Sequence, residues 1–197
     1  MDLSLVAPPE PYGALIFDCD GTLADTMPNH FAAWQSALQA CGADISEAQF
    51  YALGGMPSDD IIRLLNQENG YTLDVAQTHA DKERRYVERL TSVGEIKAVA
   101  DIARANFGLT PMAVASGGIR RVVEKTLTAA GLRSLFEVVV TADDVERGKP
   151  APDIFLLAAE RLGVPPAECI VYEDGDLGLE AARRAGMRAV DVRVLWS

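Results

Sequence analysis

The stretch that decides the fold is Ala14-Leu15-Ile16-Phe17-Asp18-Cys19-Asp20-Gly21-Thr22. Its first four residues form a short, unbroken apolar run, which is typical of a buried parallel strand. Open parallel sheets bind ligands outside the carboxyl ends of their strands, and Asp18 and Asp20 stand at that end. Because side chains of an extended chain alternate, both aspartates can face one way while Cys19 points elsewhere. We therefore expect functional aspartates and a buried structural thiol.

Composition narrows the class of protein. The chain has 197 residues and 49% hydrophobic content, enough for one sizeable core and a small second lobe. Its formal net charge of -11 argues against binding to nucleic acid or to an anionic membrane. Three scattered cysteines without CxxC spacing suit a reducing compartment. The first residues lack the pattern of a secretion signal, so we expect a soluble, cytoplasmic protein. We also expect it to be a monomer, although nothing in the sequence determines the oligomeric state.

Strands and helices alternate in the second half of the chain. We expect strands at residues 112–115, 138–140, 169–172 and 189–192, and helices at 96–107, 120–130, 153–162 and 177–185. Strands that alternate with helices form right-handed crossovers and therefore a parallel sheet. The predicted fold class is α/β, a Rossmann-like parallel sheet with helices on both faces.

The stretch between the first strand and this alternation shows helical patterns and no strand pattern. Helices are expected at residues 31–41, 61–69 and 74–90, and Ser46 with Gln49 resembles a capping box. We expect residues 1–24 and 93–197 to form an α/β core. Residues 25–92 then form a helical cap, inserted after the first strand and joined to the core by short linkers near Thr22 and Ser92.

Polar residues follow or precede the other predicted elements at the same edge of the sheet. Ser116 and Gly117 follow the strand 112–115, Lys149 precedes the helix 153–162, and Glu173 and Asp174 end the strand that starts at Cys169. Because parallel strands gather ligands at their carboxyl ends, we expect these residues to converge on the two aspartates.

These motifs, in this order, resemble those of the haloacid dehalogenase-like superfamily. The first motif matches residues 18–22, the second Ser116, the third Lys149, and the fourth Glu173-Asp174, although Gly175 replaces the serine common after that pair. Within the superfamily the chain is similar to the small-cap branch that contains β-phosphoglucomutase and the fructose-1-phosphate phosphatases. It is more similar to the latter, through residues 149–153 and 181–193.

The residue types account for the chemistry that the resemblance implies. Asp18 can attack phosphorus to form an aspartyl phosphate, and Asp20 can give a proton to the leaving oxygen and take one from water. Ser116 and the Gly117 amide, at the start of a helix, can bind phosphate oxygens, and Lys149 can bridge Asp18 and the phosphate. Like charges held close together are expected to raise the pKa of Asp20.

The charge balance predicts a metal. Four negative charges, from Asp18, Asp20, Glu173 and Asp174, face one positive charge from Lys149, so the site needs a cation. Oxygen ligands favour Mg²⁺. We expect Asp18, Asp174 and Glu173 to bind it, together with the backbone carbonyl of Asp20 that the resemblance implies.

The cap is expected to govern specificity. His30, Gly55 and Lys82 match positions that face the active site in the sugar-phosphomutase relatives. The alternative interpretation is that His30 is structural or solvated, and that Lys82 lies on an exposed helix face within residues 81–85.

Three functions of different classes remain open. The first is a Mg²⁺-dependent hydrolase of small sugar phosphates such as fructose 1-phosphate. The second is a phosphomutase, which needs a grip on a second phosphate; Ser58 stands where β-phosphoglucomutase has an arginine, but Arg120 or Arg121 could supply that charge. The third is a receiver-like module that accepts phosphate on aspartate without catalysis. A dehalogenase would have no use for Asp20 or for an acidic metal-binding pair.

Overall fold

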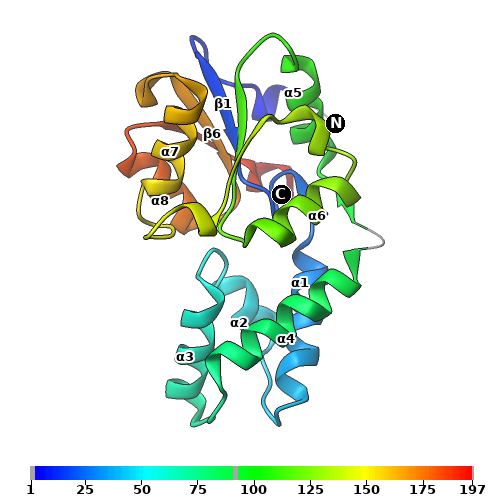
Figure 1. Ribbon diagram of the computed structural model, residues 1–197. Coiled ribbons are helices and arrows are strands. Elements are labelled where there is room, and N and C mark those ends of the chain that lie inside the picture. Colours follow the sequence, from blue (N-terminus) through cyan, green and yellow to red (C-terminus); the bar gives the residue numbers. More distant parts are fainter. Residues whose placement is uncertain (1–2, 91–92, 197) are drawn as a thin grey trace.

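The computed structural model describes residues 3–90 and 93–196, which form an upper lobe built on a sheet and a lower lobe of helices (Figure 1). The sheet has five strands, all parallel, in the order β5-β4-β1-β6-β7. The strands are β1 (Ala14–Phe17), β4 (Met112–Ala115), β5 (Val138–Val140), β6 (Cys169–Glu173) and β7 (Arg188–Asp191). The predicted fold class is confirmed.

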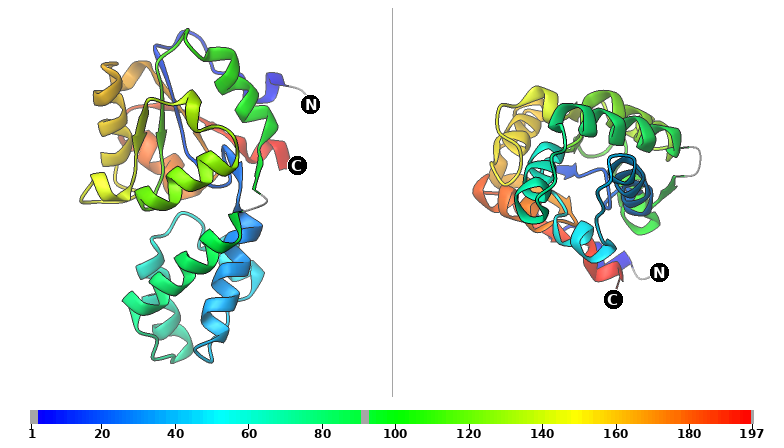
Figure 2. Two further views of the ribbon diagram at one scale, coloured as in Figure 1. Left: turned by 45° about the vertical axis from the view of Figure 1, so that its right-hand side comes forward. Right: turned by 90° about the horizontal axis from the view of Figure 1, so that it is seen from below.

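Helices cover both faces of this sheet (Figure 2). On one face α5 (Lys97–Asn106) and α6 (Arg120–Ala129) pack against alternate residues of β1, Leu15 and Phe17. On the other face α7 (Asp153–Leu162) and α8 (Asp176–Arg184) pack against Ala14 and Ile16. Each large apolar side chain buried in this way stabilises the fold by about 1.5–3 kcal/mol. The central strand is thereby fixed between two hydrophobic layers.

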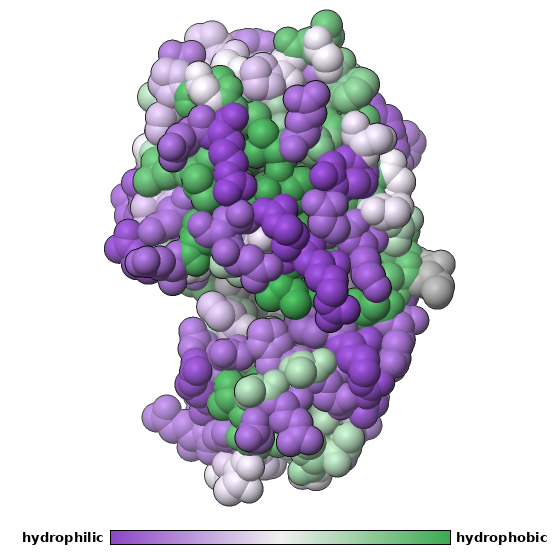
Figure 3. Space-filling view, viewed as in Figure 1, coloured by the Kyte–Doolittle hydropathy of each residue, from purple (hydrophilic) through white to green (hydrophobic). Residues whose placement is uncertain are grey.

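The lower lobe contains α1 (Met27–Gln39), α2 (Glu47–Ala52), α3 (Ser58–Asn69) and α4 (Val75–Glu88). Trp34, Leu38, Phe50 and Ile62 belong to a hydrophobic core of its own. The expected capping box at the start of α2 is confirmed, because the Ser46 hydroxyl accepts from the Gln49 amide at 3.2 Å and the Gln49 side chain accepts from the Ser46 amide at 3.0 Å. The surface narrows between the two lobes (Figure 3).

A two-stranded antiparallel sheet links the lobes, and the sequence patterns did not predict it. Its strands are β2 (Ala24–Asp25) and β3 (Gly94–Glu95). Two residues are too few to show an alternating pattern, so such strands have no sequence signal. The expected linker residue Ser92 lies outside the described residues. The division of the chain into domains at residues 25 and 92 stays a prediction.

Several element boundaries differ from those expected. The first helix begins at Met27 rather than near residue 31, because Pro28 is favourable in the first turn of a helix. It ends at Gln39. Short 3₁₀ helices also occur, at Leu3–Val6, Arg133–Leu135, Ala142–Asp144, Pro166–Glu168 and Val192–Trp196. Among the described residues, none of the helices has the length and apolar character needed to span a membrane.

Candidate active site

Asp18 directly follows β1, the middle strand of the sheet. The carboxyl end of β1 points toward the helical lobe (Figure 1). Its backbone amide donates to the Tyr172 carbonyl at 3.0 Å, so the pairing of β1 with β6 continues past the end of the strand. This pairing brings Asp18 beside Glu173 and Asp174, which end the neighbouring strand. The expected convergence of these three residues is therefore present.

The turn after Asp20 has little free space. Gly21 has a φ of 82°, and a β-carbon there would lie 2.2 Å from Oδ2 of Asp174, so no larger residue fits without displacing that carboxylate. The Thr22 hydroxyl donates to Oδ1 of Asp174 at 3.0 Å. Gly21 and Thr22 therefore fix the position of Asp174, a role of Thr22 that the sequence analysis missed.

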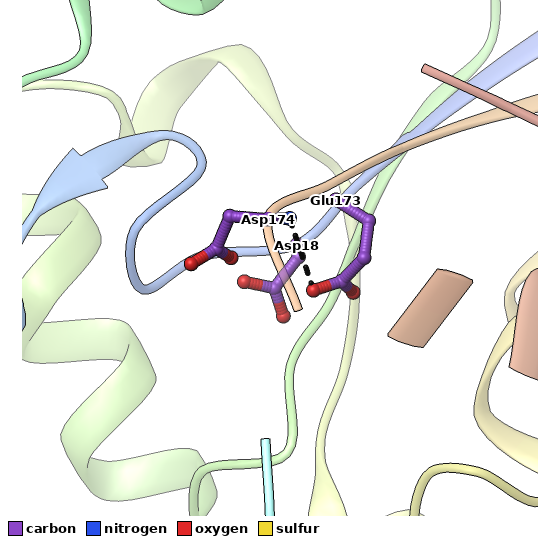
Figure 4. Close-up of side chains that lie close together, drawn as sticks. All are labelled: Asp18, Glu173 and Asp174. Atoms are coloured by element: carbon purple, nitrogen blue, oxygen red, sulfur yellow. Dashed lines mark hydrogen bonds between the residues drawn. The ribbon is translucent and has the colours of Figure 1, made fainter. Parts of the chain in front are cut away.

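A buried cluster of three carboxylates and one lysine forms the centre of the site; Figure 4 shows its carboxylates. One ligand oxygen from each of Asp18, Glu173 and Asp174 lies within 4.8 Å of the other two. Lys149 Nζ donates to Oδ1 of Asp18 at 2.6 Å and to Oε2 of Glu173 at 2.7 Å. Lys149, Asp18 and Glu173 are buried and Asp174 is half-buried. The expected contact of Lys149 with Asp18 is present, and its contact with Glu173, which was not predicted, joins the first and fourth motifs.

The cluster holds more negative than positive charge, and its pKa values reflect this. Burial raises the pKa of Asp18; the Lys149 charge opposes this, while the charges of Glu173 and Asp174 add to it. Burial, together with the charge of Glu173, raises the pKa of Asp174 to about 7. Burial opposes the charge on Lys149, but Asp18 and Glu173 outweigh this and raise its pKa. Three carboxylates with one ammonium fit a site that binds a divalent cation.

Glu173 is fixed by more than the lysine. Its Oε1 accepts from the amides of Asp174 at 3.2 Å and Gly175 at 3.0 Å. Gly178, in the first turns of α8, packs so closely that a β-carbon there would lie 2.0 Å from Oε2 of Glu173. The role of Gly178 was not predicted from the sequence, although a glycine inside a helix, which costs about 1 kcal/mol relative to alanine, was an available signal.

Ser116 and Gly117 follow β4 at the same edge of the sheet. The Ser116 amide donates to the Val140 carbonyl at 3.0 Å, and its buried hydroxyl accepts from the Gly118 amide at 3.2 Å. The helix α6 begins at Arg120, directly after this loop. The loop therefore lies beside the site and leads into the N-terminus of a helix, where anions bind favourably. Its phosphate-binding role stays a prediction.

Asp20 has two hydrogen-bonding partners from the helical lobe. Its Oδ1 accepts from His30 Nε2 at 3.2 Å and from the Tyr86 hydroxyl at 3.4 Å. Burial disfavours ionisation of Asp20, but the charge and hydrogen bond of His30, with help from Thr26, hold its pKa below the usual value. The expectation that neighbouring carboxylates raise the pKa of Asp20 is wrong, because His30 contacts Asp20 and stabilises its ionised form. The sequence does not reveal this contact.

The three predicted cap residues lie near the core or near Asp20. His30 contacts Asp20 and stacks on the Tyr86 ring, with centroids 3.8 Å apart and planes 2° from parallel. A β-carbon on Gly55 would lie 3.4 Å from Cβ of Leu177, so this turn reaches the start of α8. His30 is therefore not simply solvated.

Lys82 is 4% exposed, so the alternative interpretation of an exposed face is wrong for this residue. Its Nζ donates to Glu83 at 2.7 Å and lies 5.6 Å from the centre of the Trp34 ring and 5.7 Å from that of the Tyr86 ring. A run of charges on a helix usually faces solvent, but here α1 supplies aromatic cover. Contact of His30, Gly55 or Lys82 with substrate stays a prediction.

The arginines proposed for a second phosphate are engaged elsewhere or exposed. The Arg120 guanidinium donates to Asp144 at 2.5 Å and to the Val139 carbonyl at 3.1 Å, and its backbone amide donates to Asp143 at 2.8 Å. Arg121 is exposed. Arg120 thus fixes the segment after β5 rather than a ligand.

Comparison with known proteins agrees with this arrangement. Residues 12–186 match the family described as haloacid dehalogenase-like hydrolase. The chain is 41% identical to fructose-1-phosphate phosphatase YqaB of Escherichia coli strain K12, an alignment that covers 94% of this chain and 99% of that protein.

Solved structures share the fold. The crystal structure of CbbY from Rhodobacter sphaeroides in complex with phosphate superposes with a TM-score of 0.81 at 29% identity, covering 91% of this chain and 85% of that one. β-Phosphoglucomutase from Clostridium difficile gives a TM-score of 0.77 at 23% identity, covering 91% of this chain and 83% of the other.

Proposed function

The chain belongs to the haloacid dehalogenase-like hydrolases, and from this we propose that it is a Mg²⁺-dependent phosphatase that hydrolyses small sugar phosphates through a phosphorylated Asp18. The observation that carries the proposal is the buried cluster of Asp18, Lys149, Glu173 and Asp174 at the carboxyl end of the central strand. A nucleophile, its counter-ion and candidate metal ligands meet there in one place.

The substrate class rests on similarity and on the helical lobe. A relative named fructose-1-phosphate phosphatase aligns along nearly its whole length, which supports a hexose phosphate as substrate. We assign residues 25–92 as a cap over the core, with His30, Gly55 and Lys82 as candidate sugar contacts. Hydroxyl groups of a sugar suit such polar side chains. The free cysteines support a cytoplasmic location, and we expect a monomer.

Asp18, Asp174 and the backbone carbonyl of Asp20 are the groups that would hold Mg²⁺. Both oxygens of Glu173 already accept hydrogen bonds, from Lys149 and from two backbone amides, so we assign it chiefly to holding Lys149. When bound, Mg²⁺ would offset the charge of the carboxylates and of the incoming phosphate.

Asp18 is the proposed nucleophile. Lys149 donates to its Oδ1, which fixes the carboxylate and leaves Oδ2 for attack. The bond from this oxygen to phosphorus forms as the bond from phosphorus to the sugar oxygen breaks, and the sugar oxygen takes a proton from Asp20. Water then attacks phosphorus and gives its proton to Asp20 as the bond to Asp18 breaks. Ser116, the Gly117 amide and Lys149 bind the phosphate oxygens.

The low pKa of Asp20 fits the second step directly, because a carboxylate is the form that accepts a proton. For the first step Asp20 must carry a proton. A phosphate dianion placed beside it adds negative charge and so raises its pKa, which favours protonation when substrate binds.

The mutase alternative has weaker support. A mutase must bind a second phosphate, and Arg120 is engaged with Asp144 while Ser58 begins α3. Ser58 carries no charge, and the charge of Arg120 is already paired with that of Asp144.

Phosphate release from a panel of sugar phosphates, with Mg²⁺ and with EDTA, tests the function. Metal-dependent release led by fructose 1-phosphate or another hexose phosphate, and lost in Asp18→Asn and Asp20→Ala, is the expected result. Conversion of β-glucose 1-phosphate to glucose 6-phosphate without net release would indicate a mutase. Phosphorylation without turnover would indicate a receiver-like module.

A further inference from the structure

Two buried hydroxyl groups, of Tyr86 and Thr126, are connected to Asp20 by hydrogen bonds. The Tyr86 hydroxyl on α4 is 2.9 Å from Oγ1 of Thr126 on α6 and 3.4 Å from Oδ1 of Asp20. Both Tyr86 and Thr126 are 0% exposed. Tyr86, a residue of the helical lobe, therefore forms hydrogen bonds both to Thr126 on α6 and to Asp20, the proposed acid and base.

The direction of these hydrogen bonds follows from the number of protons. A carboxylate can only accept, so Tyr86 donates its single hydroxyl proton to Asp20. Its oxygen must then accept the proton of Thr126. Burial, together with the charge of Asp20, raises the pKa of Tyr86 far above its ordinary value, so the phenol keeps its proton. The result is a chain of donors that runs from Thr126 through Tyr86 to Oδ1 of Asp20.

The two oxygens of Asp20 consequently differ. Oδ1 accepts from both His30 and Tyr86, on the side of the helical lobe. Oδ2 faces the loop after β4, where a β-carbon on Gly118 would lie 4.0 Å from it. Ser116 belongs to the same loop, so Oδ2 is the oxygen turned toward the proposed phosphate site.

We propose that Tyr86 is a positioning residue for Asp20: its hydroxyl, oriented by Thr126, holds Oδ1 so that Oδ2 is the oxygen that exchanges protons with the leaving group and with water. This proposal rests on the proposed function of Asp20 as acid and base. His30 supplies the second donor and stacks on the Tyr86 ring, so the ring packing and the hydroxyl make separate contributions.

Tyr86→Phe separates those contributions, because it keeps the ring and removes the hydroxyl alone. Thr126→Val removes the orienting hydroxyl at nearly constant volume, and Thr126→Ser keeps that hydroxyl. Tyr12→Phe is the matched control: it removes a hydroxyl bonded to Asn106 at 3.2 Å, near the amino end of β1 and away from the site.

The experiment compares two leaving groups. With fructose 1-phosphate the departing alkoxide needs a proton, so we expect Tyr86→Phe to lower kcat by about 10- to 100-fold with KM changed less than about twofold. With p-nitrophenyl phosphate the phenolate leaves without a proton, so the first-turnover burst of p-nitrophenol should be unchanged. Thr126→Val should lower kcat on the sugar phosphate, Thr126→Ser should restore it, and Tyr12→Phe should match the native enzyme.

Equal kcat values for Tyr86→Phe and the native enzyme on the sugar phosphate would overturn the role. A p-nitrophenol burst slowed as much as kcat on the sugar phosphate would also overturn it. Should Tyr86→Phe fail to fold, Thr126→Val and Thr126→Ser decide the question: equal turnover of these two variants contradicts the donor chain. Native enzyme that hydrolyses neither substrate would instead contradict the proposed function itself.

Discussion

Replacement of Gly178 by alanine should have two opposing effects on the stability of the fold. In an ordinary helix this change stabilises a protein by about 1 kcal/mol. Here the new methyl group would lie 2.0 Å from Oε2 and 2.1 Å from Cδ of Glu173. Carbon atoms pack comfortably at about 3.5–4.0 Å, so the Glu173 carboxylate must move by well over 1 Å.

That movement is costly because the carboxylate has three hydrogen-bonding partners: Lys149, the Asp174 amide and the Gly175 amide. Removal of one partner from a buried ion pair costs about 3–5 kcal/mol, and displacement that leaves Lys149 bonded to Asp18 should cost somewhat less, about 2–3 kcal/mol. After the helix gain, the net destabilisation is about 1–2 kcal/mol. For a chain of this length this corresponds to a Tm lower by about 2–8 °C.

Activity should fall further than stability. Once Glu173 has moved, Lys149 loses a partner that fixes its position, so Lys149 and the Asp18 carboxylate bonded to it shift together. A misplacement of about 1 Å costs about 100-fold in kcat. Thermal unfolding and phosphate release measure both effects. In the double variant Gly178→Ala/Glu173→Asp the shorter side chain makes room, so Tm should recover while activity stays low. A Tm raised by Gly178→Ala, with kcat unchanged, would refute this reasoning.

Further predictions concern charge and the cap. Lys149→Met leaves Asp18 and Glu173 without their counter-ion, so we expect a loss of about 3–5 kcal/mol in the free energy of unfolding at pH 8, measured by urea titration, and turnover reduced at least about 1000-fold. In EDTA, stability should fall as pH rises from about 4 to above 7. Folding raises the pKa of Asp174 to about 7, so the folded state binds more protons than the unfolded state in that window. Mg²⁺ should raise Tm at pH 8 and have little effect at pH 5, and a flat Tm profile in EDTA would contradict the charge assignment. Lys82→Met should lower Tm, because it leaves the buried Glu83 carboxylate without its partner, and should raise KM for the sugar phosphate by about tenfold; an unchanged KM would place Lys82 outside the substrate site.

The sheet and the main motifs were predictable because they depend on local pattern and one topological rule. The strand 112–115 and the helix 153–162 have the boundaries that their apolar runs indicate. The carboxyl-end rule then correctly placed Asp18, Lys149 and Glu173 in one cluster. Neither step requires knowledge of side-chain packing.

What the sequence did not reveal depends on contacts between distant elements. Burial acts to raise the pKa of Asp20, and His30, which lies on α1 and contacts Asp20, helps to bring it below its usual value. Lys82 appeared exposed because its neighbours in sequence are charged, whereas the aromatic rings that bury it include one from another helix. Gly178 matters only because Glu173 lies against it in space. Patterns along the chain carry no information on such tertiary neighbours.

The central claim is that Asp18 carries the phosphoryl group, and acid quenching of a single turnover tests it most directly. Enzyme in excess is mixed with fructose 1-phosphate labelled in its phosphate, with Mg²⁺ present, and the labelled peptide is mapped. We predict a hydroxylamine-sensitive acyl phosphate on Asp18 that forms transiently in the native enzyme and is absent from Asp18→Asn. Phosphate release by the native enzyme without any labelled protein, or a label on another residue, would contradict the mechanism.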